Sequence, residues 1–203
     1  MRVHGLDDGH TTWTVEEPVS TLTPGLEQLL AQAHLATRRQ TFDPMDRAVD
    51  TLADARLTHT LLHHEWRLEK QYGLTSALPA MSQLWRAEDG ALHVASKGAP
   101  EAVAELCHLP AEEHAALRAR VATYADRGLR VLAVAAGRFE GEVPPEHMHD
   151  FDFRLLGLVA FEDPLRASVP QAIAEARAAG LAVRMITGDH PATAQAMAKQ
   201  AGL

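Results

Sequence analysis

Cysteine, net positive charge and long apolar runs are all scarce in this sequence, and each scarcity excludes a class of protein. Cys107 is the only cysteine among 203 residues, so an intrachain disulfide and a thiolate-based zinc site are excluded. No stretch approaches the roughly 18 consecutive apolar residues of a membrane-spanning helix. No basic N-terminal segment leads into an apolar run, as it would in a signal peptide. The net charge of −8 argues against nucleic acid or anionic lipid as a partner.

Apolar residues make up 46% of the chain, which is enough for a packed core. We therefore expect a soluble, acidic globular unit of the cytoplasm. Histidine is the unusual component, with 12 copies that include His59, His63 and His64, and the pair His147 and His149. Two histidines four residues apart on a helix can bind a metal ion, but no carboxylate or thiol completes a ligand set. We interpret these histidines as a polar helix face and a loop, and predict no metal site.

The first 162 residues have the pattern of an antiparallel sheet with flanking helices. Thr23-Pro24 and Asp43-Pro44 each combine an N-cap residue with proline at the first helical position. Asp89-Gly90 separates two apolar segments and predicts a hairpin turn. Further helices are expected after Pro100 and over residues 112–127, and a further strand over residues 129–136.

The last part of the chain has a different pattern. Residues 155–161 and 181–186 are nearly continuous apolar runs, and helical spacing follows each of them. This alternation predicts a parallel βαβ unit of α/β type, covered on both faces. We place the boundary at Asp163, which gives a first domain over residues 1–162 and a partial second domain over residues 163–203.

Three segments could carry chemistry. Lys97 and Gly98 stand where a strand ends and a helix opens, a place where backbone N–H groups and a cation can bind an anion; an ordinary turn fits the same residues. Thr187, Gly188 and Asp189 follow the 181–186 segment, where the ligands of open α/β sheets gather; helix capping is the alternative. Asp163, Pro164 and Arg166 suit a hinge or a plain linker.

Five motifs occur in the order found in P-type cation-transporting ATPases. They are Phe-Asp-Pro-Met-Asp-Arg-Ala from residue 42, Lys-Gly-Ala-Pro-Glu from 97, Gly-Leu-Arg-Val-Leu-Ala from 128, Asp-Pro-Leu-Arg from 163 and Met-Ile-Thr-Gly-Asp from 185. The chain resembles this family over essentially its whole length. The implied fold is an antiparallel nucleotide-binding domain followed by part of a Rossmann-like, haloacid-dehalogenase-like phosphorylation domain.

The resemblance also implies a role for each matching residue. Asp46 would face the adenine amino group, Lys97 with Gly98 would border the base and its phosphates, and Arg130 would reach the phosphate side. The hinge would comprise Asp163, Pro164 and Arg166. Thr187, Gly188 and Asp189 would surround the phosphorylated aspartate and its Mg²⁺ in the complete enzyme, as supporting catalytic residues.

Several departures from the family pattern are informative. The phosphorylation motif Asp-Lys-Thr-Gly-Thr and the later Gly-Asp-Gly-x-Asn-Asp segment are absent; the family order would place them before Met1 and after Leu203. We therefore expect a cut-out piece that binds ATP without turnover, because it lacks the nucleophile. Leu74 stands where relatives often place an aromatic residue against the base. An aliphatic wall there costs roughly 1 kcal/mol of stacking.

The leading hypothesis is thus an ATP-binding cytoplasmic part of a membrane-embedded P-type ATPase. ATP, presented to an aspartate outside this chain, would drive cation transport by the remaining cytoplasmic and transmembrane domains. The absence of a Ser-Glu-His-Pro-like motif argues against the heavy-metal branch, and we favour a calcium-type pump. A noncatalytic nucleotide-sensing module is the alternative. A soluble haloacid-dehalogenase-type phosphatase would need an Asp-x-Asp motif, whereas Asp7 and Asp8 are adjacent.

Overall fold

The protein is built on one seven-stranded antiparallel sheet. The structure is a computed structural model that describes residues 1–16, 21–37, 42–141, 143–186 and 191–203. The strand order is β2-β1-β7-β6-β5-β4-β3, and every neighbouring pair is antiparallel, as predicted for the first 162 residues. The strands are β1 (Arg2–Asp7), β2 (Thr12–Thr14), β3 (Arg67–Tyr72), β4 (Ala80–Arg86), β5 (Leu92–Gly98), β6 (Arg130–Phe139) and β7 (Arg154–Glu162).

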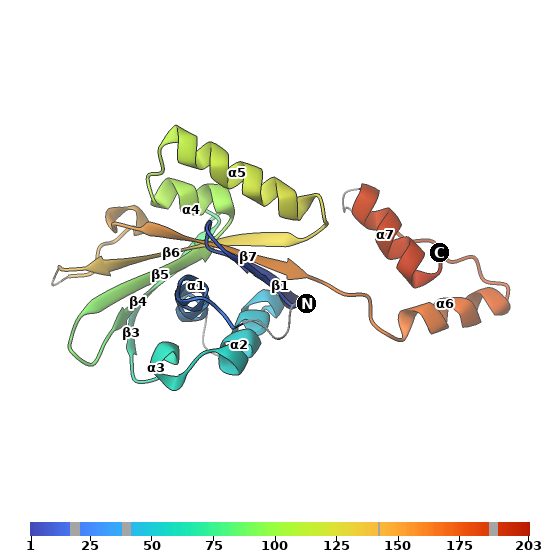
Figure 1. The fold of residues 1–203 in the computed structure, drawn as a ribbon, viewed down its shortest axis with the longest axis horizontal. Helices are drawn as coiled ribbons and strands as arrows, with labels where there is room; N and C mark the ends of the chain where they lie inside the picture. Colours follow the sequence, from blue (N-terminus) through green and yellow to red (C-terminus); the bar gives the residue numbers. More distant parts are fainter. Residues whose placement is uncertain (17–20, 38–41, 142, 187–190) are drawn as a thin grey trace.

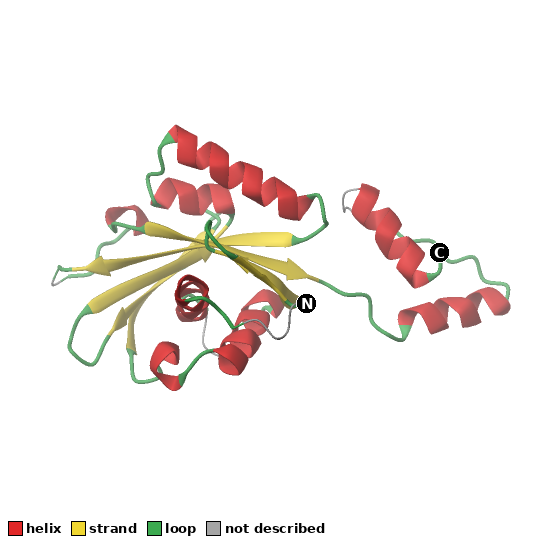
Figure 2. Ribbon diagram, viewed as in Figure 1, coloured by secondary structure: helices red, strands yellow, loops and turns green. Residues whose placement is uncertain are grey.

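Helices cover both faces of this sheet (Figure 1, Figure 2). One face carries α1 (Pro24–Leu35), α2 (Pro44–Arg56) and the short α3 (His59–Leu62), and the other carries α4 (Pro100–Leu106) and α5 (Ala111–Ala125); a 3₁₀ turn, η1 (Met148–Asp150), precedes β7. Leu29 and Leu30 of α1 are fully buried against Val134 and Phe161 of the sheet. Because strands alternate their side chains, Ala133 and Leu158 face the opposite layer, under α4 and α5.

The capping signals in the sequence form as predicted. The Thr23 hydroxyl accepts a hydrogen bond from the Leu26 N–H at 3.4 Å. The Asp43 carboxylate accepts from the N–H groups of Met45 at 2.7 Å and Asp46 at 3.3 Å. These bonds satisfy N–H groups that a helix start leaves unpaired. The cap also fixes the first turn of α2, so that the Asp46 side chain faces the sheet.

The predicted hairpin between β4 and β5 is confirmed. Gly90 has φ +87°, which few residues other than glycine adopt, and the Asp89 carboxylate accepts a hydrogen bond from the Ala91 N–H at 2.9 Å. This turn sets the register of the hairpin, with Trp85 opposite His93. The register then determines which residues of β5 face the layer of α1 and α2.

The C-terminal segment departs from its prediction. Residues 181–186 form no strand, and Leu181 and Ile186 are 63% and 97% exposed. The expected parallel pairing is wrong for the described residues, because residues 155–161 lie in β7 between two antiparallel partners, β1 and β6. A strand exists only through hydrogen bonds to a neighbouring strand, and residues 181–186 pair with no strand in the described part of the chain.

The two predicted helices of this segment do form, as α6 (Val169–Ala178) and α7 (Pro191–Ala201). They pack against each other, and Figure 1 shows them away from the sheet, beyond the stretch that follows β7. α6 has no buried residue. Among the helices that the structure describes, none combines the length and the apolar character needed to cross a membrane.

Candidate functional site

The strand register brings most of the predicted nucleotide-binding residues to one end of the sheet. Lys97 lies near the end of β5, between Met81 of β4 and Val134 of β6. Arg130 is the first residue of β6, and Leu74 follows β3 by two residues. Because adjacent strands run in opposite directions, the end of β5, the start of β6 and the end of β3 lie at the same end of the sheet (Figure 1).

Asp46 reaches the same end of the sheet from helix α2. The Lys97 ammonium donates hydrogen bonds to the Asp46 carboxylate at 2.5 Å and to the Thr37 hydroxyl at 2.6 Å. Thr37 in turn donates to the Ala33 carbonyl in the last turn of α1 at 2.9 Å. Asp46 of the first motif and Lys97 of the second, 51 residues apart in sequence, are therefore in direct contact.

This lysine is deeply buried. Lys97 is only 3% exposed, and the Asp46 carboxylate is nearly as enclosed. Burial lowers the pKa of Lys97, while the negative charge of Asp46, helped by the more distant Asp43 and Asp50, opposes that decrease. A buried cation of this kind is stable only with a partner, so the Asp46 carboxylate and the Lys97 ammonium depend on each other.

The buried pair corrects the sequence interpretation of Lys97. We expected its charge beside the N-terminus of the following helix, as part of an anion site. The side chain instead enters the layer of α1 and α2, whereas α4, which has seven residues, packs on the opposite face of the sheet. Side chains alternate between the two faces of a strand, and Lys97 lies on the face opposite the one that α4 covers. The spacing of residues along the chain does not show which face each side chain enters.

Gly98 is required by packing rather than by an approaching ligand. A Cβ at this position would lie 2.5 Å from the Pro79 carbonyl oxygen and 2.5 Å from the Ala80 Cα. The Ala99 N–H also donates to the Pro79 carbonyl at 2.9 Å. Strands β4 and β5 approach so closely here that only glycine fits, which differs from the role that the sequence predicted.

Leu74 and Arg130 lie on the surface at this end of the sheet. Leu74 is 56% exposed, just before a turn in which the Leu78 N–H donates to the Thr75 hydroxyl at 3.0 Å. Arg130 is also exposed, and its guanidinium makes no hydrogen bond or ion pair with any described residue. Tyr72 differs from both, since its hydroxyl donates to the Pro145 carbonyl at 2.7 Å and its ring packs in the core.

The remaining predicted residues lie toward the C-terminus. Asp163, Pro164 and Arg166 occupy the irregular stretch between β7 and α6, and the Asp163 carboxylate lies 3.1 Å from the Met1 ammonium. Thr187, Gly188 and Asp189 lie outside the described residues. No group of three or more histidine, cysteine, aspartate or glutamate side chains suited to a metal ion occurs in the described part of the chain.

The histidine-rich segment differs from its interpretation as a polar helix face. Helix α3 ends at Leu62, and His63 has a left-handed backbone with φ 48°. The His63 ring stacks on the indole of Trp66 at 3.9 Å between ring centroids, and His93 of β5 stacks on the same indole at 4.5 Å. Sequence analysis missed this contact, although an aromatic residue three positions after His63 could have indicated it.

Comparison with known proteins places these features in a family. The model of the haloacid dehalogenase-like hydrolases matches residues 20–203, and the chain belongs to this family. Within it, the chain is similar to P-type cation-transporting ATPases, as the five motifs indicated. It is 32% identical over 156 residues to plasma membrane calcium-transporting ATPase 1 of Gallus gallus, and 31% identical over the same length to ATPase 1 of Homo sapiens. It is also 31% identical over 155 residues to ATPase 3 of Homo sapiens.

These alignments cover 68% of this chain but only 13% of each relative. The chain thus corresponds to a small part of those proteins, and their names describe much longer molecules. The resemblance to P-type ATPases that the motifs suggested is confirmed. The roles of individual residues are proposals, developed below.

Proposed function

We propose that this chain is the nucleotide-binding part of a P-type cation-transporting ATPase and that it binds ATP at the sheet end formed by Asp46, Leu74, Lys97 and Arg130. The observation that carries the proposal is the contact between Asp46 and Lys97. It joins two motifs that the sequence separates, at the end of the sheet that also carries the exposed Leu74 and Arg130. Apolar contact combined with a few fixed polar groups is what a nucleotide requires.

Each residue has a distinct task in this proposal. One oxygen of the Asp46 carboxylate is held by Lys97, which leaves the other oxygen to accept a hydrogen bond from the adenine amino group. Leu74 supplies an apolar surface for the base without the additional stacking energy of an aromatic ring. Arg130, which has no counter-charge among the described residues, supplies a cation to the phosphates. Lys97 acts indirectly, by orienting Asp46.

In the whole enzyme, ATP bound here would present its γ-phosphate to an aspartate outside this chain. Residues 163–203 would belong to the phosphorylation domain, and the hinge at Asp163, Pro164 and Arg166 would bring the nucleotide to the acceptor. Mg²⁺ bound with the nucleotide would neutralise charge on the phosphates. The chain would lie on the cytoplasmic side of a membrane protein, and the similarity to calcium-transporting relatives favours Ca²⁺ as the transported ion.

Isothermal calorimetry with ATP and adenosine tests the phosphate-binding role of Arg130. Arg130→Gln is expected to weaken ATP binding about fivefold, or about 1 kcal/mol, and to leave adenosine binding unchanged. Arg118→Gln is the matched control, because Arg118 is equally exposed but lies in α5 on the other face of the sheet. Equal ATP affinity in the two variants would refute the role assigned to Arg130.

A further inference from the structure

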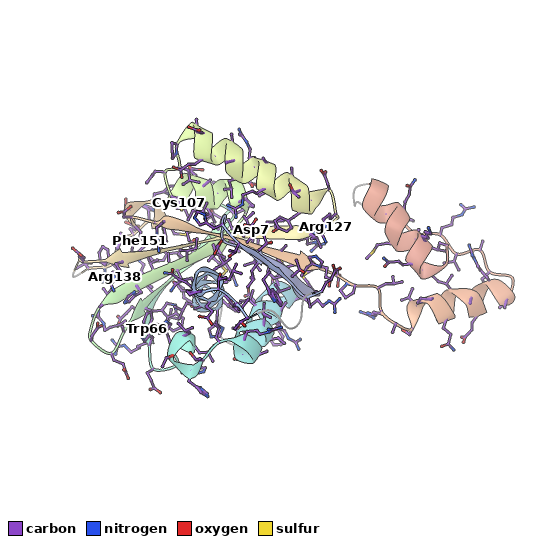
Figure 3. All side chains as sticks on the ribbon, in the orientation of Figure 1. Asp7, Trp66, Cys107, Arg127, Arg138 and Phe151 are labelled. Atoms are coloured by element: carbon purple, nitrogen blue, oxygen red, sulfur yellow. The ribbon has the colours of Figure 1, made fainter. Side chains whose placement is uncertain are left out.

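A cavity lies on the same sheet face as Lys97, at the opposite end of the sheet. Its volume is 730 Å³, and it is lined by residues of α1, the segment after α3, and the sheet strands β5, β6 and β7. His93 lies at the beginning of β5, whereas Lys97 lies near its end. Figure 3 shows Trp66 and Arg138, two of the lining residues, at the end of the sheet away from α6. None of the five motifs lines this cavity.

Three cationic or titratable side chains form a row along its floor. His93 of β5 lies directly opposite Arg138 of β6. Arg154 of β7 lies opposite Ala136, two residues before Arg138, so that both arginines face the same side of the sheet. Glu27 and Asp152 also line the cavity, yet neither guanidinium forms an ion pair or hydrogen bond with a residue that the structure describes.

This arrangement is unfavourable without an anion. Arg138 and Arg154 are diagonal neighbours on one face of β6 and β7, where two like charges repel each other. Burial lowers the pKa of His93, and the nearby guanidinium of Arg138 lowers it further. An anionic group placed between the two arginines would relieve the repulsion, and a planar carboxylate or a phosphate matches the geometry of a guanidinium.

Three stacked rings, here called the Trp66 wall, line the cavity beside these side chains. His63 and His93 both stack on Trp66, at 3.9 Å and 4.5 Å between ring centroids, and all three rings line the cavity. Leu61 and Phe153 add apolar surface. The cavity thus combines ring surface and apolar side chains with two guanidinium groups that have no partner among the described residues. This combination suits a small planar ligand with one charged end.

We propose that this cavity binds a planar aromatic anion, with its ring against the Trp66 wall and its carboxylate or phosphate between Arg138 and Arg154. The site is independent of the proposed ATP site, because the two lie at opposite ends of the sheet. No segment of the described chain fills it. The proposal concerns binding alone and involves no reaction.

The full chain titrated with 2-naphthoate, followed by ¹H–¹⁵N NMR, tests the proposal. The amides of His93, Arg138 and Arg154 are expected to shift with a dissociation constant of about 1 mM. Acetate, which lacks the ring, and 2-naphthylmethanol, which lacks the charge, should each bind at least about tenfold more weakly. 2-Naphthyl phosphate in place of 2-naphthoate shows whether a phosphate or a carboxylate is preferred, and binding of either supports the proposal.

Two variants and a control complete the test. Arg138→Gln is expected to weaken naphthoate binding at least about fivefold. Trp66→Leu is also expected to weaken it, because this variant removes the indole ring while keeping apolar volume. Arg118→Gln is the control and is expected to leave naphthoate binding unchanged. Saturating ATP should not alter the naphthoate affinity. Wild-type affinity in Arg138→Gln, shifts confined to the Lys97 end, or displacement of naphthoate by ATP would each overturn the inference.

Discussion

On the sheet face that α1, α2 and α3 cover, positively charged side chains have different surroundings at the two ends of the sheet. At one end, Lys97 is buried and paired with Asp46 and Thr37. At the other, Arg138 and Arg154 share a cavity without a partner among the described residues. Enclosing a charge demands a fixed partner, whereas an open cavity leaves the charge available to a ligand. The buried pair at the Lys97 end, called the closed end below, therefore contributes to the fold. The cations of the Arg138 cavity, called the open end below, remain available to a ligand.

The largest expected effect concerns the closed end. Asp46→Asn removes the counter-charge of a buried ammonium and is expected to lower the free energy of unfolding by about 3–5 kcal/mol. The double variant Asp46→Leu with Lys97→Met removes both charges and should lie close to wild type. Urea unfolding followed by circular dichroism measures all three proteins. If the single and double variants were equally destabilised, packing rather than charge pairing would govern this end.

Adding an aromatic ring at the closed end should strengthen nucleotide binding. Leu74→Phe is expected to raise the ATP affinity about fivefold, which corresponds to about 1 kcal/mol of stacking on the base. Leu181→Phe is the control, since Leu181 is similarly exposed but lies in the C-terminal segment. Calorimetry compares the two. An unchanged affinity in Leu74→Phe would mean that the base does not lie against this residue.

The open end should make stability sensitive to mild acid. Burial lowers the pKa of both His63 and His93 below the ordinary value of 6.5, and their mutual proximity contributes for His63. The unfolded chain then binds more protons, so stability is complete above pH 6.5 and is lost as pH falls through 6.5 toward the lowered values. His63→Gln with His93→Gln should flatten the decline seen in urea unfolding between pH 7 and pH 5. An identical decline in the double variant would contradict this.

The smallest expected change in the free energy of unfolding is that of Arg138→Gln, and its sign is opposite to that of Asp46→Asn. Arg138→Gln removes a charge that repels its neighbours, and it is expected to raise the free energy of unfolding by a few tenths of a kcal/mol, about 0.3 kcal/mol. Glu27→Gln, at another residue that lines the cavity, removes a carboxylate instead and should not raise the free energy of unfolding. Thermal unfolding at low salt gives the comparison. A loss of stability in Arg138→Gln would show that its cation has a partner after all.

Local signals in the sequence were sufficient for most of the elements. Thr23 and Asp43 cap their helices, and Asp89-Gly90 forms its hairpin, because each of these features depends on residues only a few positions apart. For the apolar segment 181–186, local signals were not sufficient. Its composition favours a strand, but a strand also needs a hydrogen-bonding neighbour, which no local pattern supplies.

The sequence motifs named candidate residues for the site, but they did not give its geometry. In the structure, Asp46 and Lys97 are in contact, and Arg130 begins β6 at the same end of the sheet. The burial of Lys97 and its bond to Thr37 depend on how α1 and α2 pack on β5, which is a long-range consequence of the fold. Gly98 was assigned to a ligand when its neighbour is strand β4, because a sequence does not indicate which backbone comes close to a glycine.

The most direct test of the nucleotide-binding proposal is an NMR titration of the whole chain with ATP. We expect binding in the high-micromolar to millimolar range, about 4–6 kcal/mol, with the backbone amides near Leu74, Lys97 and Arg130 shifting together. Shifts confined to the histidine-rich segment 59–64 or to the Arg138 cavity would contradict it.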